Sequence, residues 1–252
     1  MVIDEAQDFS ANEVRAVANQ LAQDHSITYV LDAVQRIYPH FLTWREVGVE
    51  INRNNVYRLA RNFRNTVQIA AFARPLLESL EVDDDGTIPD FTKCTRQGPK
   101  PIVLVGKYSA QINWTLNYIT ENVDLRTESV AFLHAKGGGW FNFTRQQLTK
   151  ARLPFVELTQ QVEWPEGSEN IALSTFHSAK GLEFDWAFIL GLNSEVTPHG
   201  PDEQDTQFEN LRRLLAMGIG RAIKQVVIGY KEEDAPSLVA LLNPTTYSRV
   251  LL

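Results

Sequence analysis

The sequence predicts an α/β fold built on a mostly parallel sheet. Two observations lead to this prediction. Short apolar runs rich in β-branched residues recur along the chain, and helix-like segments separate most of them. Strands that alternate with helices usually form a parallel sheet with helices on both faces. The chain has 252 residues, of which 44% are hydrophobic and 22% charged. This composition is typical of a globular protein, and the length is enough for one large domain or two small ones.

The first elements are predicted from three segments near the amino terminus. Ser10 and Glu13 have the spacing of a capping box, which marks the start of a helix. An apolar stretch before this helix and another after it indicate strands. In chain order we expect a strand end at 1–3, a helix at 10–23, a strand at 26–32, and a strand and turn at 56–65.

The rest of the chain alternates more regularly. A helix is predicted at 66–81, followed by a polar loop or linker at 82–101. Three consecutive glycines within 134–141 indicate a turn. The remaining strands are predicted at 102–106, 129–134, 171–175, 186–192 and 225–230. Helices are predicted near 109–122, 141–151 and 207–217.

A domain boundary is predicted close to residue 57. Residues 1–57 contain too few strands for a complete sheet and are predicted to be a fragment. Residues 58–252 are long enough for a complete α/β domain.

Composition limits the compartment and the partners. No stretch approaches the roughly 20 apolar residues of a membrane span, and no secretion leader is recognisable, so we expect a cytoplasmic protein with no membrane partner. Cys94 is the single cysteine, which excludes an internal disulfide. The formal net charge of −7 argues against a broad surface that coats nucleic acid, but it is compatible with a local basic groove.

Acidic residues and a glutamine follow two of the predicted strands. Asp4 and Glu5 come directly after the apolar residues 1–3, and Gln35 follows Asp32 at the end of the second strand. Carboxylates at a strand end can hold Mg²⁺ or act as a general base, and Gln can orient a water near a phosphate. Taken singly, the acidic pair is also what a solvated turn would contain.

Arginines with neighbouring polar or aromatic residues mark three further segments. Arg64 stands beside Phe63, a combination suited to a phosphate and a base, or to a helix start and a core ring. The stretch 172–192 contains Thr175, His177 and Glu183, and we expect these polar groups at one sheet edge. Glycines at 218 and 220 are expected to end a helix and to present Arg221 at the sheet edge.

The order of these motifs carries a family resemblance. "VIDEAQDF", "LDAVQRIY", "NFRN", "STFHSAKGLEF" and "LRRLLAMGIGRA" resemble, in this order, the DExxD, GDxxQxIY, NYRS, TxHxxKGLEF and RRLLYVAxTRA elements of UvrD/Rep/PcrA-type superfamily 1 DNA helicases. The resemblance covers nearly the whole chain. It implies that 58–252 is a second RecA-like motor domain of the P-loop NTPase class, without a large inserted accessory domain, and that 1–57 is a fragment of the first motor domain.

The resemblance also implies a role for each matching residue at the nucleotide. ATP and Mg²⁺ would be the cofactors. The implied roles are Asp4 as magnesium ligand, Glu5 as catalytic base, Gln35 as the link from the terminal phosphate to DNA, Arg64 and Arg221 on the γ-phosphate, Phe63 as the ring that stacks on adenine, and Glu183 on the ribose.

For DNA, the resemblance implies four residues. Thr175 and His177 would lie on the DNA side, and Tyr38 and Trp44 would stack near the single strand. Single-stranded and duplex DNA are therefore the expected partners. The tryptophan of this family often follows the tyrosine more closely than Trp44 follows Tyr38.

The sequence departs from the family pattern at several places. Leu31 replaces a glycine, Phe63 replaces a tyrosine, and Ile219 with Gly220 replaces the usual Val or Met and Thr. The largest departure is that no GxxxxGK[ST] occurs, although this P-loop should precede the strand at 1–3. We therefore expect the chain alone to be inactive as an ATPase.

Three interpretations follow from the missing P-loop. The chain is part of an ATP-driven helicase that translocates along single strands and unwinds duplexes, and whose amino-terminal half is absent. Alternatively, it is a stand-alone binding module for single-stranded DNA or protein, or it is half of a split motor that another chain completes in trans.

Overall fold

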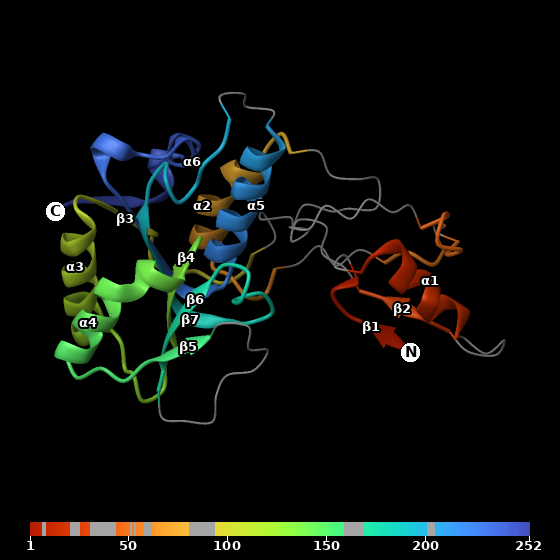
Figure 1. Ribbon diagram of the computed structural model, residues 1–252, viewed down its shortest axis with the longest axis horizontal. Helices are drawn as coiled ribbons and strands as arrows, with labels where there is room; N and C mark the ends of the chain where they lie inside the picture. The colour runs from red at the N-terminus through yellow and green to blue at the C-terminus, as the bar shows by residue number, and fades with distance from the viewer. Residues whose placement is uncertain are drawn as a thin grey trace. The chain divides into compact units, whose positions relative to one another are not determined.

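Figure 1 shows the computed structural model of the protein. The structure describes residues 1–6, 9–20, 26–30, 44–50, 52, 54–57, 62–80, 94–158, 169–200 and 205–252. These residues fall into two compact units. The first comprises those within Met1–Arg61 and Ser79–Pro89, and the second those within Asn62–Glu78 and Asp90–Leu252. The assignment of residues 1–57 and 58–252 to two motor domains stays a prediction.

The first unit is a small α/β fragment. Strands β1 (Val2–Ile3) and β2 (Thr28–Tyr29) pair in parallel, and helix α1 (Ala11–Asn19) lies between them in sequence. The predicted capping box is confirmed: the Glu13 amide donates to Ser10 Oγ at 3.3 Å, and the Ser10 amide donates to Glu13 Oε2 at 2.7 Å. Among the described residues, the core of this unit is formed by Ile3, Ala6, Val14, Trp44 and Val47.

The second unit contains a seven-stranded sheet in the order β5-β6-β4-β7-β8-β3-β9, and every neighbouring pair is parallel. The predicted α/β class is confirmed. The strands are β3 (Ile102–Val105), β4 (Val130–His134), β5 (Val156–Leu158), β6 (Ile171–Thr175), β7 (Phe184–Leu192), β8 (Ala222–Tyr230) and β9 (Ser248–Leu251). The central strands β4 and β7 read as continuous apolar runs because helices cover both faces of the sheet.

The helices form a layer on each face of the sheet. Figure 1 shows α3 and α4 on one side and α2 and α5 on the other. Their bounds are α2 (Val67–Leu77), α3 (Tyr108–Asn122), α4 (Asn142–Lys150) and α5 (Thr206–Gly220), and a short α6 (Ser237–Ala240) follows β8. Helix α2 begins where Thr66 Oγ1 accepts from the Ile69 amide at 3.2 Å. No helix among the described residues is both long and apolar enough to cross a membrane.

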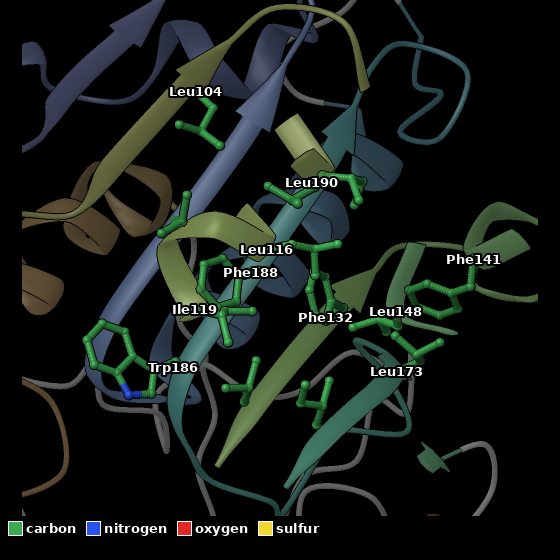
Figure 2. Packing of buried hydrophobic residues seen from close by; sticks show 14 residues of the cluster. Leu104, Leu116, Ile119, Phe132, Phe141, Leu148, Leu173, Trp186, Phe188 and Leu190 are labelled. Atoms are coloured by element: carbon green, nitrogen blue, oxygen red, sulfur yellow. The ribbon is translucent and has the colours of Figure 1, made fainter. Parts of the chain in front are cut away.

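One core cluster of the second unit lies between the sheet and the helices α3 and α4 (Figure 2). Phe132 of β4 stacks on Phe188 of β7 with ring centroids 5.5 Å apart. Leu116 and Ile119 of α3 point toward this pair (Figure 2). Burial of large apolar side chains contributes about 1.5–3 kcal/mol each, so this layer holds the strands in register and fixes where their ends lie.

Several sequence predictions were wrong in detail. The described residues within 56–65 form no strand, and α2 ends at Leu77 rather than at 81. Strands β5 and β9 were not predicted, because both are short strands at sheet edges and contain charged residues. The expected linker at 82–101 lies partly outside the described residues, and its described part is irregular apart from a single bridge between Arg96 and Thr66.

Candidate functional site

Three of the predicted site residues come together at the amino ends of β7 and β8. Glu183 directly precedes β7, Arg221 directly precedes β8, and Arg64 lies just before α2. Arg64 Nε donates to Glu183 Oε1 at 2.5 Å, and Arg64 Nη2 forms an ion pair with the same oxygen. The two side chains are 35% and 43% exposed. A guanidinium and a carboxylate are therefore both accessible at this end of the sheet.

Arg221 is held differently from Arg64, because it is only 2% exposed. Its Nη1 donates to the carbonyl oxygen of Leu182 at 3.3 Å. Its own carbonyl oxygen accepts from the Phe184 amide at 3.0 Å. Leu182 and Phe184 are the two neighbours of Glu183, so these bonds fix Arg221 against the segment that carries the carboxylate.

The expectation that a glycine ends the helix before Arg221 is confirmed for Gly220, whereas Gly218 lies inside the helix. Helix α5 continues through Gly218 and ends at Gly220, and Arg221 is its C-cap. Gly218 is needed because Phe176 packs closely against the helix: a Cβ at this position would lie 2.5 Å from Phe176 Cε1. Arg221, which lies in the turn between α5 and β8, is buried.

A turn at residues 62–65 places Arg64 and exposes Phe63. The amides of Arg64 and Asn65 donate to Asn62 Oδ1 at 3.1 and 3.0 Å. Side chains of Asn commonly bind backbone amides two and three residues further on in such turns. Phe63, in the middle of the turn, is 66% exposed beside the Arg64–Glu183 pair. An exposed aromatic ring at this position is free to stack on a flat ligand group.

Two polar residues in this region were missed by sequence reasoning. Asn65 is buried and donates from Nδ2 to the carbonyl oxygens of Gly220 and Ala222, at 2.9 and 2.7 Å. Arg96 donates from Nη1 to the Arg64 carbonyl oxygen at 3.0 Å. Two asparagines three residues apart, next to an arginine, were the only signal of this arrangement in the sequence.

Thr175 and His177 lie toward the opposite end of the sheet. Thr175 ends β6 and aligns with His134, the last residue of β4. Trp186 of β7 aligns with Val130, the first residue of β4, and β7 begins two residues before Trp186. The expectation that Thr175, His177 and Glu183 share one sheet edge was therefore wrong. Strands β6 and β7 are both parallel to β4, so residues 176–183 must run from one end of the sheet to the other.

The turn after β6 is closed by Thr175. Its hydroxyl contacts Ser178 Oγ at 3.0 Å and accepts from the Ser178 amide at 3.0 Å. His177 is exposed in the middle of this turn. Partial burial of its ring, together with the nearby charge of Lys180, lowers the pKa of His177. Near neutral pH this turn therefore presents a neutral imidazole and the positive charge of Lys180.

A second histidine lies beside this turn, at the carboxyl end of β4. His134 is buried, and its Nδ1 accepts from the amides of Lys136 and Gly137 at 3.1 and 3.0 Å. Burial, with a smaller effect of the Lys136 charge, lowers the pKa of His134 to about 4. Its ring stacks on Trp140, with centroids 5.4 Å apart. His134 therefore shapes the glycine turn as a neutral acceptor.

The site residues predicted in the first unit are only partly described. Asp4 is exposed, and its Oδ1 accepts from the Glu5 amide at 2.9 Å. Glu5 has a φ of 54°, an uncommon conformation for this residue type that is found more often at functional sites. Gln35 and Tyr38 lie outside the described residues. No group of three or more metal-ligating side chains occurs in the described part of the chain.

Trp44 lies in the core of the first unit, where its ring packs against Tyr29 with centroids 5.2 Å apart. The predicted role of Trp44 was to stack on a base of the single strand. This role stays a prediction.

Comparison with known proteins finds a family model that matches part of the second unit. Residues 148–233 match the UvrD-like helicase C-terminal domain. This part of the chain is therefore similar to that family. The matched range includes Thr175, His177, Glu183 and Arg221, but not Arg64. It confirms the resemblance to UvrD/Rep/PcrA-type helicases that the motifs predicted.

Individual relatives agree with this assignment. The ATP-dependent DNA helicase PcrA of Bacillus subtilis is 38% identical over 73 residues, which are 29% of this chain and 10% of that protein. The ATP-dependent DNA helicase UvrD2 of Mycobacterium tuberculosis is 25% identical over 243 residues, which are 92% of this chain and 31% of that protein. The matches therefore span from about a tenth to a third of the length of these relatives.

A solved structure supports the fold. The C-terminal domain of a possible DNA helicase from Lactobacillus plantarum WCFS1 superposes with a TM-score of 0.55 and 21% identity, and the match covers 75% of this chain and 98% of that one. At this identity the likeness concerns the fold, and it agrees with a RecA-like motor domain.

Proposed function

We propose that this chain supplies the second motor domain, and part of the first, of an ATP-dependent superfamily 1 DNA helicase. In the complete protein, ATP hydrolysis with Mg²⁺ would drive translocation along single-stranded DNA and unwinding of duplexes. The observation that supports this proposal best is the group formed by Arg64, Glu183 and Arg221, with Phe63 exposed beside it. Two guanidinium groups suit phosphate oxygens, a carboxylate suits ribose hydroxyls, and an exposed ring suits a base.

The separation of the two sheet ends also supports the proposal. A motor that couples ATP to DNA must bind each ligand at a different place and connect the two places. Residues 176–183 provide such a connection, because they join the Thr175–His177 end to the Glu183 end by one continuous segment. Phe176 anchors this segment against Gly218 of α5, the helix that leads to Arg221.

The 252-residue chain is proposed to bind ATP weakly and not to hydrolyse it. Its sequence contains no GxxxxGK[ST], the loop whose backbone amides and Lys hold the phosphates in P-loop enzymes. It does contain Asp4 and Glu5, the residues proposed as magnesium ligand and catalytic base. What this chain would contribute is the arginine pair, the ribose contact and the stacking ring.

Hydrolysis is the first test of this proposal. Purified chain is incubated with ATP and Mg²⁺, with and without single-stranded DNA, and phosphate release is measured beside the variants Glu5→Gln and Arg221→Ala. We expect the parent chain to release phosphate no faster than the two variants. Turnover that is lost in both variants would contradict the proposed inactivity, and would mean that another part of the chain or a second copy holds the phosphates.

Binding is the second test, since hydrolysis alone does not distinguish a half-site from a module that binds only DNA. The chain is titrated with ATP and with inorganic triphosphate, and the Arg64 and Arg221 side-chain NMR signals are followed. Phe63→Ala should weaken ATP binding by about five-fold or more, because loss of base stacking costs about 1–3 kcal/mol, and should leave triphosphate binding unchanged.

Tyr57→Ala is the matched control, because Tyr57 is also an exposed aromatic but lies in the first unit. The Tyr57→Ala variant should bind ATP as tightly as the parent chain. Arginine signals that do not respond to ATP, in a chain that binds single-stranded DNA, would favour the alternative of a non-catalytic DNA-binding module.

A further inference from the structure

We propose that Asn65 is a positioning residue that holds Arg64 and Arg221 at a fixed spacing, so that both guanidinium groups reach the same phosphate group. This inference rests on the proposed function, in which the two arginines bind ATP. It concerns a residue that neither the motifs nor the comparisons assign, and that stands where the NYRS element has a serine.

The side chain of Asn65 joins two segments that are far apart in sequence. It is 5% exposed, and its Nδ2 donates to the carbonyl oxygens of Gly220 at 2.9 Å and Ala222 at 2.7 Å. These are the residues immediately before and after Arg221. Both amide hydrogens are used, so the residues on either side of Arg221 are held by one rigid planar group.

The other half of the amide is held as well. Asn65 Oδ1 accepts from Asn62 Nδ2 at 2.8 Å, and the Asn65 backbone amide donates to Asn62 Oδ1 at 3.0 Å. The side chain therefore has one orientation in which all of its strong hydrogen-bonding groups are satisfied. A buried polar group that is fully satisfied specifies a single geometry, because every alternative leaves a donor or acceptor unpaired.

The same network fixes the backbone of Arg64. Its amide donates to Asn62 Oδ1 at 3.1 Å, and its carbonyl oxygen accepts from Arg96 Nη1 at 3.0 Å. The next peptide leads directly into Asn65. The backbone positions of Arg64 and Arg221 are therefore connected through one buried side chain, and this connection does not depend on the Arg64–Glu183 ion pair.

An asparagine is required for this connection because two carbonyl oxygens must be bound at once. Serine has one hydroxyl donor on a shorter side chain, so it can satisfy at most one of the two carbonyls. Gly220 stands where the RRLLYVAxTRA element has a threonine. Asn65 thus supplies a side-chain contact at a helix end whose last residue has no side chain of its own.

The test follows the two arginines directly. In 15N-labelled chain, the Nε–H signals of Arg64 and Arg221 are assigned and titrated with ATP, for the parent, Asn65→Ser and Asn65→Ala. Asn170→Ala is the matched control, because Asn170 Nδ2 also donates to a backbone carbonyl in the second unit, that of Leu125 at 2.7 Å. Near-ultraviolet circular dichroism verifies that each variant is folded, and Asn65→Ser is the milder substitution if Asn65→Ala unfolds.

In the parent and in Asn170→Ala, we expect both arginine signals to shift with one common midpoint concentration of ATP. In Asn65→Ser the midpoint should rise by about five-fold, as expected when one net hydrogen bond is lost, and the Arg221 signal should already differ without ATP. A purely structural role would lower stability in Asn65→Ser and Asn170→Ala alike, but would leave the common midpoint unchanged.

Two failures remain distinguishable. If neither arginine responds to ATP in the parent chain, the proposed nucleotide binding is overturned. If both respond in the parent, and a folded Asn65→Ser titrates identically with an unchanged Arg221 signal, only the positioning role is overturned.

Discussion

The two ends of the seven-stranded sheet are built on different electrostatics. At the amino ends of β7 and β8, Arg64 and Glu183 form a charge pair, and Arg221 is buried beside them. At the carboxyl ends of β4 and β6, two histidines have lowered pKa values, because burial disfavours the charged imidazole. One end thus carries permanent charges, whereas the imidazoles at the other stay neutral near pH 7.

This difference shows how the same sheet can serve two kinds of contact. The charges at the amino end are fixed by bonds to backbone carbonyls and by the carboxylate, as suits a small, highly charged ligand that must be held in one geometry. At the carboxyl end, the positive charge near the histidines comes from lysines on loops, as suits a flexible polyanion. Each end can be perturbed separately.

The largest expected effect is at the amino end. Arg221→Ala should lower the free energy of unfolding by about 3 kcal/mol, because it removes a large buried side chain and leaves the Leu182 carbonyl without this donor. Arg249→Ala is the control: Arg249 is an exposed arginine paired with Glu232, and its loss should lower the free energy of unfolding far less. Urea unfolding measures the free energy of unfolding of both variants. Equal losses of this free energy in the two variants would contradict the structural role of Arg221.

An intermediate effect is expected at the carboxyl end. Burial and the Lys136 charge lower the pKa of His134 from 6.5 to about 4 in the folded protein. Between these values the unfolded chain binds a proton that the folded chain does not. The stability contributed by neutral His134 is therefore complete above pH 6.5 and is lost as the pH falls toward 4. We expect a loss of about 2 kcal/mol at pH 5 relative to pH 7.5.

His134→Gln isolates this contribution from that of other titrating groups. A glutamine oxygen can still accept from the amides of Lys136 and Gly137, but it does not titrate. The free energy of unfolding of the variant should therefore change less between pH 7.5 and pH 5 than that of the parent. If parent and variant lose the same amount, His134 is not the group responsible.

The smallest effect is expected for the Arg64–Glu183 pair. Both side chains are more than a third exposed, so Glu183→Gln should change the free energy of unfolding by less than about 1 kcal/mol. The variant removes the counter-charge of Arg64 and keeps an acceptor for a ribose hydroxyl. The Arg64 signal should therefore respond to ATP at a lower concentration than in the parent, most clearly at low salt. An unchanged response would indicate that the ion pair does not compete with the phosphate.

Local patterns were sufficient for much of the fold. The continuous apolar runs of β3, β4, β6, β7 and β8 and the periodic helices between them identified the α/β class. The capping box at Ser10 was recognisable because both of its hydrogen bonds join residues three positions apart. The edge strands β5 and β9 were not recognisable, since their pairing depends on a neighbouring strand more than on their own side chains.

The motifs and their order, read in the sequence by itself, determined the resemblance to a helicase family and named Arg64, Glu183 and Arg221, because residue type and spacing are local properties. Only the tertiary structure decided how these residues meet. Parallel pairing separated Thr175 from Glu183, and close packing of Phe176 on Gly218 kept Arg221 in a buried helix cap. The link through Asn65 spans 155 residues to Gly220, and a contact between segments so distant in sequence is formed only when the chain has folded.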